Sequence, residues 1–208
     1  MAKEKIKREY AELIAEKKDK WEESLPEWKE QWFNNIDISV EAYVVLWDTL
    51  KEIEKKYNID LRNIATEMRY KGGYASGVGL AKNYKEHGLK ELYLAYLSTY
   101  EVVCAYKWFE FNDEVLSLWC QSCPCIQSFR KLGRTEEEIK EMGPLFCLAD
   151  YALMMGFNPE LDIFPQPRLI MRGDSHCSYR AEDRRVEKHK KVTTTEEFAP
   201  KINLKISF

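Results

Sequence analysis

Cysteine is the residue type with the most chemical potential in this chain, because a thiolate is both a nucleophile and a metal ligand. Cys123 precedes Pro124. The residue before a proline is driven to extended geometry, whereas proline suits the first position of a helix. We therefore expect Cys123 at the N-terminus of a helix, where free amides and the helix dipole favour a thiolate. The sequence predicts Cys123 as a nucleophile or a metal ligand.

A second thiol is accompanied by a carboxylate. Cys147 and Asp150 lie three residues apart after Gly143-Pro144, where we expect a helical segment to restart, so their side chains share one helix face with Met154. A thiol and a carboxylate one turn apart can bind a metal together or act as nucleophile and base. The same spacing also fits a core position for Cys147 and a solvated Asp150.

The segment 173–177, Gly-Asp-Ser-His-Cys, contains three ionisable groups within an expected hairpin turn. Asp174 after a glycine is ordinary turn chemistry. Cys177 begins a strand and is expected to point inward with Tyr179. His176 is the histidine nearest to the thiols in the sequence.

The thiols also offer a metal site. Cys120, Cys123 and Cys125 form C-x2-C-x-C, and with Cys147 or Cys177 they would supply ligands for a divalent ion such as zinc or for an iron–sulfur cluster. No second C-x2-C completes a zinc ribbon, so a divalent ion on Cys123, Cys147 and Cys177 is favoured over a cluster. A structural alternative stays open, because free cysteine is among the most buried residue types.

Length and composition set the class of protein. The chain has 208 residues, of which 45% are hydrophobic and 32% charged, as in one globular domain. The formal net charge of −3 is too balanced for a protein whose main partner is nucleic acid. The basic N-terminus never enters an apolar stretch of signal-peptide length, so we expect a cytoplasmic protein with reduced thiols. The longest apolar run, Ala42 to Trp47, is far short of the roughly 20 residues that cross a bilayer.

The elements that position the thiols begin with helices. Apolar residues at helical spacing predict a first helix from Ile6, a second, tryptophan-rich one around Pro26, and a third that Asp37 or Ser39 caps and that ends near Tyr57. A further helix starts near Leu61 and is expected to stop at Gly72-Gly73. The stretch GGYASGVG lacks the ending of a phosphate-binding loop, so it is interpreted as a turn.

The second half predicts strands with inserted helices. Tyr100 to Phe111 and Val115 to Trp119 flank Asn112-Asp113 and indicate a hairpin. Arg168 to Arg172 with Cys177 to Arg180 indicates a second one. Between them, the helix opened by Cys123 ends at Gly133, and Thr135 with Glu138 matches a capping box for the next helix.

These expectations amount to an α+β protein with a four-stranded antiparallel sheet. A single domain covers residues 1–183, of which 1–98 are mostly helical and 99–183 hold hairpins with inserted helices. Residues 184–208 form a C-terminal tail or arm, rich in charge. This arm and the tryptophan-rich helices offer surface for a homodimer.

Four motifs in fixed order carry a family resemblance: Cys123-Pro124, Cys147 with Asp150, Gly156-Phe157-Asn158-Pro159, and Gly173-Asp174 with Cys177 and Tyr179. Over roughly residues 100–182 the chain resembles the L-2-amino-thiazoline-4-carboxylic acid hydrolase-like family. The resemblance implies hydrolysis of a small sulfur-containing ring, which opens 2-amino-thiazoline-4-carboxylate toward a carbamoyl-cysteine. It selects Cys123, Cys147, Asp150, Asp174 and Cys177.

The implied reaction needs attack on the amidine-like carbon between ring sulfur and nitrogen, by water or by a thiolate. Cys123 is the candidate nucleophile and Asp150 the candidate acid/base. Cys147 and Cys177 flank them or complete a metal site that activates water. An arginine fork pairs well with a substrate carboxylate. The candidate substrate-binding residues are Asp174, His176, Arg172 and Arg180.

Two other functions stay open. An aromatic interior built from Tyr106, Trp108, Phe109 and Trp119 would enclose a small ligand, as in domains similar to the vinyl-reductase-type sensor module. A metal or iron–sulfur accessory protein is the other alternative. The partner of this chain is a small molecule in the first two cases.

Overall fold

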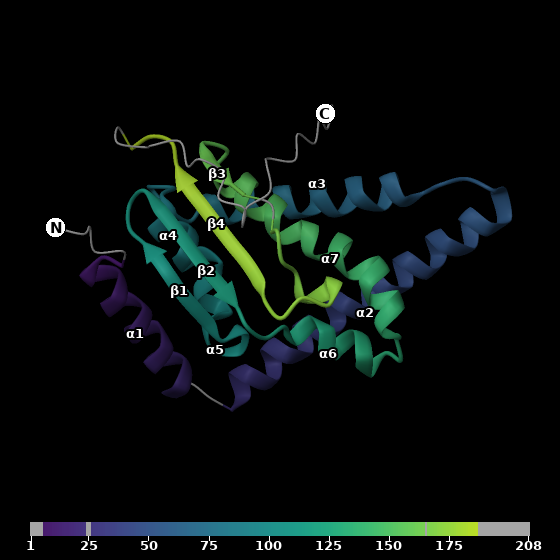
Figure 1. The fold of residues 1–208 in the computed structure, drawn as a ribbon, viewed down its shortest axis with the longest axis horizontal. Coiled ribbons are helices and arrows are strands. Elements are labelled where there is room, and N and C mark those ends of the chain that lie inside the picture. The colour runs from purple at the N-terminus through teal and green to yellow at the C-terminus, as the bar shows by residue number, and fades with distance from the viewer. Residues whose placement is uncertain (1–5, 24–25, 165, 187–208) are drawn as a thin grey trace.

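The computed structural model describes residues 6–23, 26–164 and 166–186, and it combines helices with a four-stranded sheet (Figure 1). The predicted α+β class is confirmed. The helical part holds α1 (Arg8–Glu23), α2 (Glu27–Tyr57), α3 (Arg62–Ala81), α4 (Leu89–Ala95), the 3-10 turn η1 (Leu97–Thr99) and α5 (Glu101–Cys104). The second half holds β1 (Tyr106–Phe111), β2 (Val115–Cys120), α6 (Pro124–Lys131), α7 (Glu136–Phe157), β3 (Leu161–Ile163), the 3-10 turn η2 (Ile170–Arg172) and β4 (Cys177–Asp183).

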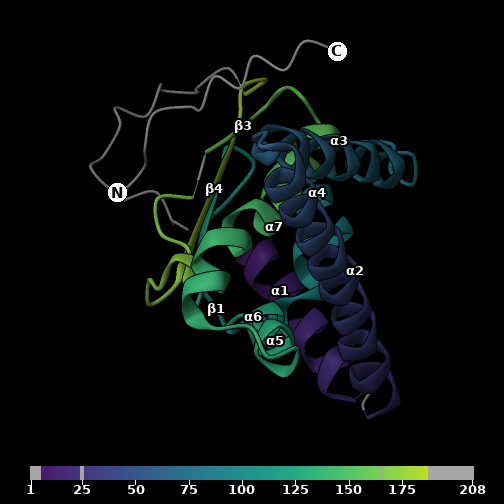
Figure 2. The ribbon, with the colours of Figure 1, turned by 90° about the vertical axis from the view of Figure 1, so that its right-hand side faces the viewer.

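The sheet is antiparallel throughout, with the strand order β1-β2-β4-β3. Figure 2 shows it nearly edge-on, with α2, α3 and α7 on one side. The register of β2 and β4 places Cys120 opposite Cys177 and Leu118 opposite Tyr179. Cys120, Leu118 and Cys177 are buried. The inward orientation expected for Cys177 is therefore confirmed.

The first predicted hairpin is present but shorter than expected. Its turn is closed by the Asn112 side chain, whose Oδ1 accepts from the amides of Glu114 and Val115 at 2.9 Å. The chain before it is helical to Cys104, and Ala105 then takes a left-handed conformation (φ 47°) that starts β1 at Tyr106. The expected strand start at Tyr100 is wrong, because α5 intervenes.

The second predicted hairpin is wrong. β4 pairs with β2 and with the three-residue strand β3, while part of the expected partner, Ile170–Arg172, is a 3-10 turn. Side chains hold this turn in place: the Leu169 amide donates to Asp174 at 2.8 Å and the Ile170 amide to the Cys177 sulfur at 3.3 Å. Residues 168–172 therefore border the cysteine strand without forming a regular ladder with it.

The expected helix boundary at Asp37 or Ser39 is also wrong, because α2 runs unbroken through both residues. No breaker interrupts the chain there, and the Asp37 carboxylate is bound by another helix. It accepts hydrogen bonds from Ser128 and from Lys131, the latter at 2.9 Å. The predicted end near Tyr57 is confirmed, with Asn58 as a left-handed cap.

The glycine-rich stretch expected to be a turn lies inside α3. A Cβ added at Gly73 would lie 2.3 Å from the carbonyl oxygen of Ala149, and one at Gly77 would lie 2.0 Å from that of Leu153. From the other side, a Cβ at Gly156 would lie 2.1 Å from the Tyr74 carbonyl oxygen. The glycines therefore allow α3 and α7 to touch through their backbones.

The helix α7 is continuous through Pro144, so the expected restart at Gly143-Pro144 is wrong. Proline removes one hydrogen bond of the helix, but packing on both sides keeps the segment helical. The Tyr43 hydroxyl donates to the Met142 carbonyl at 2.9 Å, and Arg69 donates to the Phe146 carbonyl at 2.8 Å. The predicted Thr135 capping box is confirmed.

The two ends of the chain are only partly described. The helix α1 lies beside β1 (Figure 1), where the Lys7 amide donates to the Phe111 carbonyl at 3.0 Å and Tyr10 stacks on Phe111. Residues 187–208, most of the predicted tail, lie outside the described residues. In the parts of the chain that are described, no helix is both long and apolar enough for a membrane span.

Candidate active site

A cavity of about 310 Å3 lies between the long helices and the inner face of the sheet. All six cysteines line it, and we call it the thiol cavity: Cys104, Cys120, Cys123, Cys125, Cys147 and Cys177. All six thiols are free. The rest of the wall includes four tyrosines, Tyr96, Tyr100, Tyr106 and Tyr179. The four predicted catalytic residues, which are Cys123, Cys147, Asp150 and Cys177, thus share one cavity.

Cys123 occupies the N-cap position of α6, with extended backbone angles (φ −131°, ψ 108°) and Pro124 as the first helical residue. Its pKa is lowered from the usual thiol value by the hydrogen bond from the Cys125 thiol and by the backbone amides of Ile126 and Cys125, against the effect of burial. No amide makes a capping hydrogen bond of regular geometry with the sulfur. The local geometry predicted from Cys123-Pro124 is confirmed.

Cys125 is the thiol whose hydrogen bond contributes most to lowering the pKa of Cys123. Burial and the neighbouring Cys123 sulfur raise its pKa well above the usual value. The pKa values of the two thiols therefore shift in opposite directions, and Cys123 is the one that loses its proton more readily. Hydrogen bonding to the charged form is a general means of stabilising it.

Asp150 enters the thiol cavity from α7. Burial raises its pKa from 3.8 to about 6, although hydrogen bonding by Tyr96 and the charge of Arg69 both act to lower it. Burial likewise raises the pKa of Cys147 one turn earlier, and the Asp150 charge adds to that effect. A carboxyl group with a pKa near neutrality can both give and take a proton.

The thiols on the sheet are held as neutral groups. Cys120 donates to the Ser122 carbonyl at 2.9 Å and interacts across the strands with Cys177. The pKa values of both thiols are raised far above the usual value. The largest cause is hydrogen bonding with Cys104 for Cys120, and hydrogen bonding with Cys120 for Cys177. Burial raises both pKa values further. These thiols form a neutral wall of the cavity.

The predicted metal ligands Cys123, Cys147 and Cys177 share the thiol cavity, yet they do not form a ready metal site. Within residues 6–23, 26–164 and 166–186, no group of three or more His, Cys, Asp or Glu side chains is placed to hold a metal ion. Metal binding, whether of a divalent ion or of an iron–sulfur cluster, thus stays a prediction.

The predicted substrate-binding residues lie outside the thiol cavity. The Asp174 carboxylate caps its own turn by accepting from the Leu169 amide at 2.8 Å. His176 is buried and stacks on Trp119, with the ring centres 4.0 Å apart. Trp119 is next to the inward-facing Cys120 in β2, and side chains alternate along a strand, so Trp119 and His176 lie on the opposite face of the sheet. Arg172 is exposed at the end of η2 and Arg180 is paired with Glu182 at 2.6 Å.

The arginine that does line the thiol cavity is Arg69 of α3. Arg69 is not among the residues predicted from the sequence, because an arginine in an amphipathic helix normally faces solvent. The signal that could have revealed it is its position three residues before Gly72-Gly73, at the start of the close approach between α3 and α7. Its functional relevance depends on contacts with residues more than 70 positions away.

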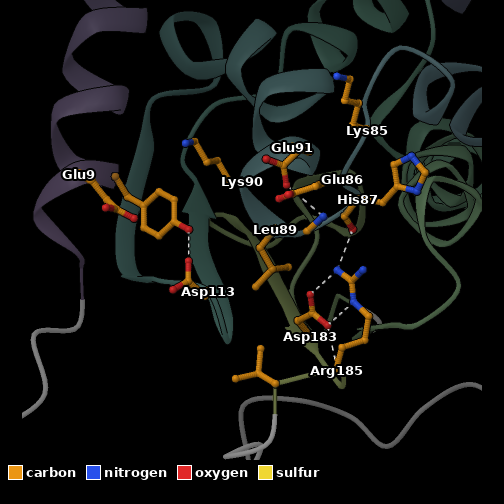
Figure 3. A pocket seen from close by; sticks show the side chains of 13 residues that line it. Glu9, Lys85, Glu86, His87, Leu89, Lys90, Glu91, Asp113, Asp183 and Arg185 are labelled. Carbon is orange, nitrogen blue, oxygen red and sulfur yellow. Dashed lines mark hydrogen bonds and ion pairs between the residues drawn. The ribbon is translucent and has the colours of Figure 1, made fainter.

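A second, larger pocket of about 580 Å3 lies near the start of α4 (Figure 3), and several of its polar groups are paired with one another or with the backbone. Asp113 accepts from the Tyr10 hydroxyl, and Asp183 accepts from Arg185 at 2.6 Å. Glu91 accepts from the Gly88 amide at 3.0 Å and so caps α4. These interactions stabilise the fold, and this pocket contains no thiol.

The model of the L-2-amino-thiazoline-4-carboxylic acid hydrolase family matches residues 37–181. The chain belongs to this family. No curated protein and no solved structure matches the chain. The matched segment of this hydrolase family begins well before the region of the sequence motifs and includes much of α2 and all of α3. It contains all six cysteines, Asp150 and Arg69, so the thiol cavity is built almost entirely from the family's own segment.

Proposed function

We propose that the protein hydrolyses a small ring of the 2-amino-thiazoline-4-carboxylate type, with the Cys123 thiolate as nucleophile. The observation that carries this proposal is the meeting of a helix-capping thiol of lowered pKa and a carboxyl group of raised pKa in one cavity. Membership of the hydrolase family supports the reaction class. A volume of about 310 Å3 suits a ligand of this size.

In the first step the Cys123 sulfur attacks the ring carbon that carries the amino group, and a carbon–sulfur bond forms. The ring bond from this carbon to its own sulfur then breaks. Asp150 in its acid form gives its proton to the departing sulfur. The product of this step is a covalent adduct in which the opened substrate is attached to Cys123.

In the second step the Asp150 carboxylate takes a proton from water, and the water oxygen attacks the same carbon. The bond to the Cys123 sulfur breaks and the thiolate is released, with a carbamoyl group left on the product nitrogen. Asp150 is again protonated. The net change is the addition of one water molecule, so atoms and charge balance without an external oxidant or reductant.

The test uses Cys123→Ser, with Cys104→Ser as a matched control from the same cavity. Loss of the nucleophile is expected to reduce turnover of 2-amino-thiazoline-4-carboxylate at least ~1000-fold, in line with losses of catalytic nucleophiles. The control variant is expected to retain activity within a few-fold. Mass spectrometry of quenched wild-type protein should show an adduct with the full substrate mass, since the ring sulfur stays attached. Unchanged turnover in Cys123→Ser would refute the proposal.

A small-ligand sensor is the alternative, and its predicted aromatic residues are divided by the sheet. Tyr106 lines the thiol cavity, whereas Trp108, Phe109 and Trp119 do not. Phe109 and Trp119 pack against each other at 4.7 Å. Binding of 2-amino-thiazoline-4-carboxylate without turnover would favour this alternative, with the four tyrosines of the cavity as the binding surface.

A further inference from the structure

The thiol cavity contains one side chain of permanent positive charge. Apart from the thiols, Arg69 and Asp150 are the two described lining residues that carry a charge at neutral pH. Arg69 is the cation of the two. The two come from α3 and α7, the helices that touch through glycine backbones. No ion pair joins Arg69 to a carboxylate of the described chain within 4.0 Å. Its charge reaches Asp150 only at longer range.

The guanidinium of Arg69 is held firmly. Its Nη2 donates to the Phe146 carbonyl at 2.8 Å, and its plane lies over the Phe146 and Tyr43 rings, with the guanidinium carbon 4.5 and 5.2 Å from the ring centres. These contacts fix the position of the group without neutralising it. A guanidinium that is orientated in advance loses less conformational entropy when it binds a ligand.

One donor of this group is unsatisfied. The Arg69 Nε atom is buried and has no hydrogen-bond partner in the described part of the chain. Leaving a buried donor unpaired costs free energy, more so when the donor is charged. A carboxylate is the group that matches the adjacent N–H donors of a guanidinium, because its two oxygens accept two parallel hydrogen bonds.

We infer that Arg69 binds the carboxylate of the ligand and makes the thiol cavity selective for small anionic or zwitterionic molecules. The inference rests on the proposed function only in that both place the ligand in the same cavity. It replaces Arg172 and Arg180, neither of which lines that cavity, as the carboxylate-binding residue. Arg69 is thus a specificity-determining residue, supplied by the helical half of the chain.

Alkylation of Cys123 tests this inference without a known substrate. Iodoacetate and iodoacetamide have the same size and reaction, but only iodoacetate carries a carboxylate. Peptide mass spectrometry gives the two rates at Cys123, and their ratio removes any change in the reactivity of the thiolate. We expect Arg69→Met to lower the iodoacetate-to-iodoacetamide ratio by about tenfold, as the loss of a charge-assisted hydrogen bond predicts. Arg69→Lys should restore part of the ratio.

The control is Arg62→Met, on the same helix but exposed and outside the thiol cavity. This variant removes the same charge from the protein. Because solvent screens an exposed charge, the iodoacetate-to-iodoacetamide ratio should stay within twofold of wild type. An unchanged ratio in Arg69→Met would overturn the inference. It would also be overturned if neither reagent modified Cys123 in the folded wild-type protein, because the cavity would then be closed to carboxylates of this size.

Turnover provides a second arm that separates the two proposals. 2-Amino-thiazoline lacks the carboxylate of 2-amino-thiazoline-4-carboxylate, so only the latter should lose affinity, as a raised KM, in Arg69→Met. If wild-type protein turns over neither compound, the proposed hydrolysis fails while the alkylation ratio still decides the role of Arg69. Equal loss for both compounds would indicate a structural role and would overturn the inference. Thermal melting of each variant shows whether it is folded.

Discussion

Cys123 and Asp150 owe their unusual ionisation to different causes. Donors at the start of α6 favour the anionic form of the thiol, whereas burial favours the protonated form of the carboxyl group. Sequence reasoning found the first cause because a cysteine before a proline has a defined geometry. It also placed Cys147 and Asp150 on one face by their spacing. It had no access to the second cause, since burial depends on α2, α3 and β4, which lie far away in the sequence.

Asp150 makes stability depend on pH in a predictable direction. Its folded pKa of about 6 exceeds the ordinary 3.8, so the folded protein retains a proton that the unfolded chain releases between these values. The resulting stabilisation is complete below pH 3.8 and is lost as the pH rises through 6. A difference of about two pKa units corresponds to up to about 3 kcal/mol, reduced to the extent that the cavity admits water.

We therefore expect Asp150→Asn to raise the free energy of unfolding at pH 7.5 by about 1 to 3 kcal/mol and to flatten its fall between pH 4 and 7. Urea denaturation at several pH values measures both effects. Glu101 is a confounding group, because burial raises its pKa to about 7 although Trp108 donates to it. Glu101→Gln is therefore the matched control. In this variant the part of the pH dependence of the unfolding free energy that is due to Asp150 should remain. A pH profile of Asp150→Asn identical to that of wild type would contradict the assignment.

The contact between α3 and α7 is the element on which the site geometry depends. Arg69 projects from the first helix, and Cys147 and Asp150 project from the second. In the sequence alone the glycines of α3 indicate a turn, because a glycine pair commonly ends a helix. The same residues instead permit close backbone contact, which becomes recognisable only when the partner helix is known. The restart expected at Pro144 is wrong for a similar reason, because packing against other helices compensates for the hydrogen bond that the proline removes.

Gly77→Ala tests this contact. A methyl group at Gly77 would meet the Leu153 carbonyl oxygen and the Phe157 amide, so we expect a loss of stability of about 1 to 3 kcal/mol, as for overpacked cores. Gly79→Ala is the matched control two residues later in the same helix, where a Cβ meets nothing within 4 Å. It should stabilise the protein by about 0.5 to 1 kcal/mol through helix propensity. Equal melting temperatures for the two variants would argue against the close packing.

On the scale of the whole molecule, composition and pattern were enough to predict the α+β class with a four-stranded antiparallel sheet, but β3 takes the place of the strand expected at residues 168–172. β3 has three residues and no alternating pattern long enough to mark a strand. It pairs with β4 through three residue pairs, which run from Leu161–Asp183 to Ile163–Ala181. The predicted homodimer and the cytoplasmic location stay predictions.

Truncation after Val186 tests the predicted division into a domain and a tail. The last described ion pairs, Arg184 with Asp162 and Arg185 with Asp183, are retained in such a chain. We expect its melting temperature to lie within about 2 °C of the full chain, because every core residue in the described part of the chain is retained. Sedimentation velocity on both chains shows whether residues 187–208 carry a dimer contact. A large fall in melting temperature would mean that these residues belong to the domain.

The strand order has a consequence for synthesis on the ribosome. Among the strands of the described chain β4 is the last to be made, yet it lies inside the sheet between β2 and β3. Until it emerges, the hydrogen-bonding edge of β2 is open, and the wall that Cys177 and Tyr179 provide is missing. An open edge invites pairing with another chain. Nascent chains that end before β4 are thus expected to be the aggregation-prone species, and a translational pause there is a point at which a chaperone would act.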